Sequence, residues 1–199
     1  MLARVRLLAL FALIAGAASC DGPVPSSAPL RTPPSRDLLS YPVLIAPVTR
    51  TTPLSTDVTW TFTAGPAGAV SSNAAVGLTI TIPAGALAAD QQITVTALAG
   101  APMAYGFSPH LTFAQPVVLT QTLQGSSAAS LLSILSGAHF AGDSLQLSAT
   151  GLAKVSEIVP TMVDSLTQTA WFSVDHFSGW IIATGETSTD DGSGGGGSQ

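Results

Sequence analysis

A histidine and a serine stand two residues apart near the C-terminal end of the chain, in the stretch VDHFSGW at residues 174–180. A serine hydroxyl is a weak nucleophile unless a nearby base takes its proton, and histidine often fills that role. His176 and Ser178 are therefore a candidate base and nucleophile. The alternative is structural. In that case Phe177 packs into a sheet, the His176 ring bonds a loop carbonyl, and Gly179 lets the backbone bend into a closing strand.

Metal chemistry would require clustered His, Cys, Asp or Glu side chains. The three histidines, His110, His139 and His176, are far apart in the sequence, and the single cysteine, Cys20, lies in the leader. We therefore predict no metal site and no cofactor.

Paired carboxylates would suit glycoside hydrolysis, since one acts as an acid and the other as a base or nucleophile. The candidate acids are Asp57, Asp90, Asp143, Glu157, Asp164 and Asp175. Solvated acids in loops and at strand edges are the favoured interpretation. The Gly-rich stretch near the C-terminus does not join a strand to a helix, so it is no phosphate loop. We predict that the protein is not an enzyme.

Aromatic side chains suggest a different function, because a flat group of them can stack on a sugar ring. The candidates are Trp60, Tyr105, Trp171 and Trp180. Trp60 has the same parity as its apolar neighbours, which assigns it to the core. Trp171 has the opposite parity to Phe172 and Val174, so it faces away from them. Trp171 is therefore the candidate contact residue.

The composition limits the possible partners. Charged residues make up 9% of the 199 residues, against roughly 25% in an average globular protein. Six Lys and Arg stand against 11 Asp and Glu, for a net charge of −5, while 46% of the residues are hydrophobic. A hydrophobic core is therefore expected. Nucleic-acid binding and docking on anionic lipid through a basic face are excluded, since both need clustered cations.

The N-terminal stretch MLARVRLLALFALIAGAASC has the three parts of an export signal: a basic start, an apolar run over residues 7–15, and small residues. The apolar run is too short for a spanning helix. Cys20 follows directly, which resembles the lipobox of bacterial lipoproteins, although Ala17 stands where Leu is usual. The alternative is ordinary cleavage beside a free thiol. Acylation of Cys20 is favoured, because a lone thiol is unusual in an oxidising compartment.

The chain divides into four predicted parts. Residues 1–19 form a lipoprotein signal peptide, and residues 20–40 form a Pro- and Ser-rich linker. Residues 41–186 form the folded domain. Residues 187–199 form a disordered Gly- and Ser-rich tail.

The folded part shows the period-two pattern of half-buried antiparallel strands, with apolar residues alternating with Thr or other polar residues. The clearest runs are 58–62, 78–82, 93–97, 117–123 and 170–174. Gly and Pro turns between them predict an all-β antiparallel sandwich. We expect a turn at residues 114–116 with Pro116 at a strand start, and another strand over residues 126–137.

Three stretches together resemble the ZU-five domain family, named for zonula occludens and netrin-receptor proteins. They are GLTITIPAGALAADQQITV (77–95), YGFSPHLTFAQPVVLTQTL (105–123) and VDHFSGW (174–180). The resemblance covers roughly residues 55–185, and the segment 124–167 matches poorly. It implies a β-sandwich used for protein contacts, without a cofactor.

In some adaptors of that family, the His-Phe-Ser motif is where the chain cuts itself. The resemblance implies that Ser178 would attack the carbonyl of Phe177, with His176 as the proton acceptor. Self-cleaving members continue into a second β domain, whereas few residues follow Ser178 here. The structural interpretation of the motif is therefore preferred.

The sequence thus predicts an exported, non-catalytic protein-interaction or structural module, lipid-anchored at the bacterial cell envelope through Cys20. Its partner would be an envelope protein or a glycan. The alternatives are a carbohydrate-binding module and a domain that cleaves itself between Phe177 and Ser178.

Overall fold

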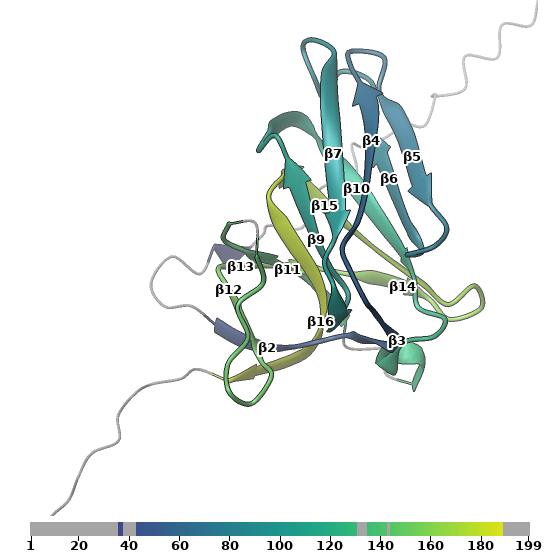
Figure 1. Cartoon of the computed structure of the whole chain (residues 1–199). Helices are drawn as coiled ribbons and strands as arrows, with labels where there is room; N and C mark the ends of the chain where they lie inside the picture. Colours follow the sequence, from purple (N-terminus) through teal and green to yellow (C-terminus); the bar gives the residue numbers. More distant parts are fainter. Residues whose placement is uncertain (1–35, 38–42, 131–134, 143, 189–199) are drawn as a thin grey trace, which may run out of the picture. The chain divides into compact units, whose positions relative to one another are not determined.

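A computed structural model describes residues 36–37, 43–130, 135–142 and 144–188 of the chain. The predicted signal peptide, Cys20, Asp143, most of the predicted linker and most of the tail lie outside the described residues. No helix in the described part is long and apolar enough to cross a membrane. The predicted all-β antiparallel sandwich is confirmed (Figure 1).

The larger of the two main sheets contains nine strands, all paired antiparallel. Its main path runs in the order β1 (Arg36–Asp37), β13 (Glu157–Pro160), β11 (Leu135–Phe140), β16 (Gly179–Ser188), β9 (Ala104–Ser108), β7 (Gln91–Ala97) and β4 (Val58–Ala64). Off this path, β2 (Val43–Pro47) pairs with β16 and with β12 (Ala153–Val155).

The smaller sheet contains five antiparallel strands and packs against the large one. Its order is β14 (Met162–Asp164), β15 (Thr169–His176), β10 (Thr112–Thr122), β6 (Leu78–Ile82) and β5 (Ala69–Asn73). A separate two-stranded ribbon pairs β3 (Thr49–Leu54) with β8 (Gly100–Pro102).

The alternation in the sequence accounts for the core between the sheets. On β6, Leu78, Ile80 and Ile82 are buried, while Thr79 and Thr81 are only partly covered. The inward residues of β7, β10 and β15 follow the same rule. Each strand therefore contributes one apolar face to a shared core.

Strand β16 is buried on both faces. Its residues Trp180 and Ile182 belong to the core between the sheets, whereas Ile181 and Ala183 belong to a second apolar cluster. That second cluster includes Val43, Ile45, Ala138, Phe140, Ala153 and Val155, from β2, β11 and β12. Strand β16 (yellow in Figure 1) is also paired along both of its edges, with β11 on one side and with β9 and β2 on the other.

Trp60 is only partly buried, so its assignment to the core is wrong in part. Its strand, β4, is an edge of the large sheet, and its indole Nε1–H donates to Ser71 Oγ at 3.2 Å on β5, an edge of the small sheet. Trp60 therefore closes one side of the sandwich.

Two predicted local structures differ from those observed. The segment 126–137 does not form one strand, because Ser127–Ser130 is a 3-10 helix and β11 begins at Leu135. The expected turn at residues 114–116 is instead an irregularity within β10, where the pairing with β15 shifts between Thr112 and Val117. Pro116 lies inside that irregularity, where its missing N–H removes no regular ladder bond.

Candidate functional site

The chain crosses from the small sheet to the large sheet at the predicted His-Phe-Ser motif. Strand β15 ends at His176 and β16 begins at Gly179. Phe177 is 1% exposed and stacks on Phe107 with ring centroids 4.3 Å apart, and the ring of Phe113 meets it edge-on at 4.6 Å. The structural role expected for Phe177 is confirmed, since its ring holds the corner between the two sheets.

His176 bonds a carboxylate rather than the loop carbonyl that the structural interpretation expected. Its Nε2–H donates to Glu157 Oε2 at 3.0 Å. Its Nδ1 lies 3.4 Å from Ser178 Oγ. Because Nε2 carries the proton shared with Glu157, Nδ1 of the neutral ring faces the serine with its lone pair.

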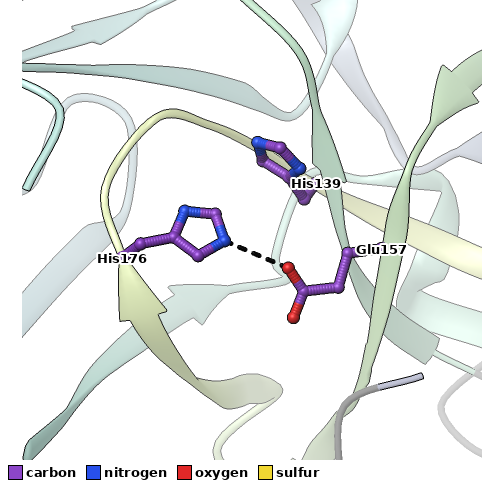
Figure 2. Close-up of side chains that lie close together, drawn as sticks. All are labelled: His139, Glu157 and His176. Carbon is purple, nitrogen blue, oxygen red and sulfur yellow. Dashed lines mark hydrogen bonds and ion pairs between the residues drawn. The ribbon is translucent and has the colours of Figure 1, made fainter. Parts of the chain in front are cut away.

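A second histidine, His139, lies beside this pair (Figure 2). The rings of His139 and His176 meet edge to face with centroids 4.8 Å apart, and His139 Nδ1 lies 2.7 Å from Ser156 Oγ. The buried ring of Trp180 lies 5.4 Å from His139 and 5.3 Å from His176, centroid to centroid. The indole Nε1–H of Trp180 also donates to the backbone carbonyl of His176 at 3.2 Å. The two imidazoles are therefore supported by a rigid aromatic side chain.

Strand register explains why these residues meet. On β11, His139 is directly opposite Glu157 of β13 on one side and Trp180 of β16 on the other. Residues that are directly opposite in antiparallel strands point to the same face. His176 arrives from the end of β15. The wide sequence separation of the histidines was therefore no guide to their distance, and the prediction missed His139 and Glu157 as members of this site.

The cluster borders an open hollow of about 420 Å³. Its lining includes His110, Thr112, His139, Gly142, His176 and Ser178. All three histidines of the chain therefore line one depression. A small ion or water molecule has access to the imidazoles from that side.

The two central histidines have opposite pKa shifts. The hydrogen bond that His176 donates to the Glu157 carboxylate raises the pKa of His176 above its ordinary value, although burial opposes this effect. Burial lowers the pKa of His139, and the neighbouring His176 lowers it further. At neutral pH, His139 is therefore the ring held neutral, and His176 is the one that more readily accepts a proton.

Trp171 lies where its parity predicts. Its neighbours Ala170 and Phe172 are buried in the core, whereas Trp171 lies on the opposite face and is partly exposed. It is directly opposite Met162 of the edge strand β14, whose side chain is 62% exposed. We call Met162 and Trp171 the edge patch.

The other aromatic candidates do not form a platform with Trp171. Trp180 and Tyr105 are 1% and 2% exposed, and both belong to the core. Trp60 is at the opposite side of the fold, on β4 of the large sheet. The predicted four-residue platform for a sugar is therefore wrong. A sugar ring could stack only on the edge patch.

Among the candidate acids, two lie near His176, and two others accept hydrogen bonds from backbone N–H groups. Glu157 bonds His176, and Asp175 Oδ1 lies 3.9 Å from His176 Nε2. Asp57 accepts from the Ala99 N–H at 2.7 Å, and Asp164 accepts from the Leu166 N–H at 2.8 Å. Asp57 and Asp164 therefore stabilise loops.

Arg50 is a buried cation at a second hollow. Its side chain is covered by the ring of Tyr105, 5.7 Å away, and its Nη1 donates to the Pro102 carbonyl. Its Nε and Nη2 are buried and find no hydrogen-bond partner among the described residues. Because those two atoms are closed off from solvent, a ligand in the hollow has no direct access to them.

Comparison with known proteins adds no family to this description. No protein-family model matches the chain, and no significant match is found among curated proteins. The class that the structure defines is an antiparallel β-sandwich, and the resemblance to ZU-five domains stays a prediction.

Proposed function

We propose that this protein is a non-catalytic protein-interaction or structural module, held at the bacterial cell envelope by acylated Cys20. The observation that supports it best is the edge patch. Most large apolar side chains of the described residues are buried in the two clusters, yet Met162 and Trp171 are directly opposite each other on an outer face. Exposed aromatic and Met side chains are typical of contact surfaces.

The position of the patch supports contact with a protein rather than with a sugar alone. Among the described strands, β14 is an edge of the small sheet and pairs on one side only, which suits the addition of a partner strand on the other side. The neighbouring turn carries Leu166, which is 94% exposed. A partner strand added to β14 would gain main-chain hydrogen bonds and cover apolar side chains at the same time.

The test is recovery of a partner from cell-envelope extracts by cross-linking, with the wild-type chain and with Trp171→Ala and Met162→Ala. Both variants should lose the cross-linked partner. Val70→Ala is the matched control, because Val70 is 70% exposed on β5, the other edge of the same sheet. Equal recovery with all three variants would contradict the edge patch as the contact surface. Binding to purified glycans that Trp171→Ala abolishes would instead favour a carbohydrate-binding module.

Self-cleavage is a second candidate function, favoured by the line of Ser178, His176 and Glu157. The hydroxyl faces Nδ1 of the imidazole, and the carboxylate holds the opposite nitrogen. This is the order of nucleophile, base and orienting acid that activates a serine. The 3.4 Å separation is long for a hydroxyl–imidazole hydrogen bond, so we place this candidate second.

In such a reaction, Ser178 Oγ would attack the carbonyl carbon of Phe177 while His176 Nδ1 takes the hydroxyl proton. The Phe177–Ser178 C–N bond breaks as the proton passes to the departing nitrogen, which leaves an ester. Water then hydrolyses the ester to the Phe177 carboxylate and the Ser178 hydroxyl. The C-terminal fragment would stay in place without a second domain, because β16 pairs with β9, β11 and β2.

Intact mass under denaturing conditions separates the two candidates. A non-catalytic module gives one uncut species. Self-cleavage gives two fragments that join at Phe177 and Ser178, absent from Ser178→Ala and formed more slowly in Glu157→Gln.

A further inference from the structure

We infer that His139, Glu157 and His176 form a binding site for a divalent transition-metal ion, with zinc as the best match. Each residue offers one ligand atom, and these atoms all lie within 4.8 Å of one another. Two imidazoles and one carboxylate are a ligand set that zinc uses in sites with an open fourth position. This site is separate from the edge patch and does not depend on it.

The distance between two of the ligand atoms already suits a metal ion. Two ligands about 2.0–2.1 Å from a tetrahedral zinc are roughly 3.3 Å apart. His176 Nε2 and Glu157 Oε2 are already 3.0 Å apart (Figure 2). A zinc ion that replaces the shared proton would therefore need only a small separation of these two atoms. The three ligand atoms lie within 4.8 Å of one another, so the His139 nitrogen would have to approach the other two atoms by up to about 1.5 Å to complete a tetrahedral site.

Each histidine has a serine hydroxyl beside its second ring nitrogen, at a short hydrogen-bond distance for His139 and at a longer distance for His176. Ser156 Oγ is 2.7 Å from His139 Nδ1, which leaves Nε2 of that ring as the ligand nitrogen. Ser178 Oγ is 3.4 Å from His176 Nδ1, so Nε2 is again the atom on the metal side. Metal-binding histidines usually make such a bond with the second nitrogen, because it fixes the tautomer and the ring orientation.

The surroundings favour a transition metal over calcium or magnesium. Imidazole nitrogens suit zinc and its neighbours, whereas calcium and magnesium prefer oxygen ligands. The side chains of His176 and Glu157 are 28% and 15% exposed, so the site is shielded but not closed. The hollow beside the rings gives an ion a route in and room for a water molecule as fourth ligand.

The experiment titrates the metal-free full chain with Zn²⁺ alone, by calorimetry, and with Co²⁺ as a spectroscopic probe. We expect one equivalent to bind and the Co²⁺ form to show the visible absorption of a four-coordinate ion. Loss of an outer partner alone typically lowers metal affinity about 10- to 100-fold, so Glu157→Gln and His139→Ala should lower it at least tenfold. Ser156→Ala should give a smaller loss of affinity.

Two variants control for binding elsewhere. Cys20→Ser removes the thiol, and Asp164→Asn removes a carboxylate from β14, outside the cluster. Both should keep the wild-type affinity. Thermal unfolding without metal checks that each variant folds, and the isosteric Glu157→Gln still tests the site if His139→Ala does not fold.

No saturable binding up to about 1 mM Zn²⁺ would overturn the inference, as would wild-type affinity in a folded Glu157→Gln. Either result would mean that His176 and Glu157 form an ion pair, with the His139 ring edge to face against His176, and that the cluster does not bind a metal ion. The proposed contact function would stand, because its test changes Met162 and Trp171 instead.

Discussion

Two histidines at the crossing between the sheets differ in their surroundings, and a proton titration should detect the difference. In metal-free protein with a chelator present, we expect His176 to titrate above about 6.5 and His139 below it. The bonded Glu157 carboxylate favours the charged form of His176, whereas burial and the positive His176 disfavour it at His139. Two-dimensional NMR of the ring protons measures both pKa values. Glu157→Gln should lower the pKa of His176.

These two pKa shifts determine how the unfolding free energy changes with pH. The raised pKa of His176 gives a stabilising contribution that is fully present below the unfolded value of about 6.5 and is lost as pH rises through the folded pKa. The lowered pKa of His139 acts in the opposite direction, because protonating it in acid favours the unfolded chain. Denaturant unfolding at several pH values should show that Glu157→Gln loses stability mainly at the acid end. A uniform loss at every pH would contradict the role of the ion pair.

Gly179 has a packing role that the sequence did not suggest. Besides its place at the bend between the sheets, it allows a close contact, since a Cβ at Gly179 would lie 2.3 Å from Cε2 of Phe140. We predict that Gly179→Ala lowers the unfolding free energy by about 1–3 kcal/mol through overpacking. Chemical denaturation measures this loss of unfolding free energy. Phe140→Leu should relieve the clash, so the double variant should lose less than the sum of the two single losses.

Among the elements, β6 offers the cleanest test of the sandwich. Ile82 is 2% exposed in the core, whereas Thr81 faces the other side of the strand. Ile82→Ala should lower the unfolding free energy by about 2–5 kcal/mol, because it removes buried methyl groups and leaves a cavity. Thr81→Ala should lower it by well under half of that. Equal losses would show that both faces of β6 are covered.

The sequence could predict elements whose two faces differ, and β6, β7 and β15 are of this kind. It could not predict where each strand lies in its sheet. Trp60 alternates in register with core residues of its strand, but that strand is an edge of the sheet, so the Trp60 side chain is only partly buried. Pro116 reads as a strand boundary, yet β10 continues through it with a shift in register.

The cluster of His139, Glu157 and His176 could not be predicted either, because it also depends on how the strands are placed in their sheets. His139 and Glu157 meet because β11 and β13 pair in one register, and His176 reaches them only because the chain changes sheets there. A shift of one residue in that pairing would turn Glu157 to the opposite face. Local spacing carries no sign of such a pairing.

For the whole molecule, the enclosure of β16 ties distant parts of the chain together. Its partner β2 comes from the start of the described fold, and its other partners, β9 and β11, come from the middle. Because these contacts span most of the domain, β16 can be completed only after the rest of the chain is available. A cut between Phe177 and Ser178 would therefore leave a C-terminal fragment held by three strands and two apolar clusters, and not a free peptide.

The last prediction concerns attachment of the whole molecule to a membrane through Cys20, which lies outside the described residues. If Cys20 is acylated, the mature protein should partition into the detergent phase, and Cys20→Ser should stay uncleaved or appear in the aqueous phase. One acyl chain binds membranes only marginally, at about 0.8 kcal/mol per buried methylene, so stable anchoring requires at least two. Intact mass should therefore show a mature chain that begins at Cys20 and carries the added lipid. A mature N-terminus downstream of Cys20 without lipid mass would contradict the anchor, and a contact made through Trp171 would then take place away from the membrane.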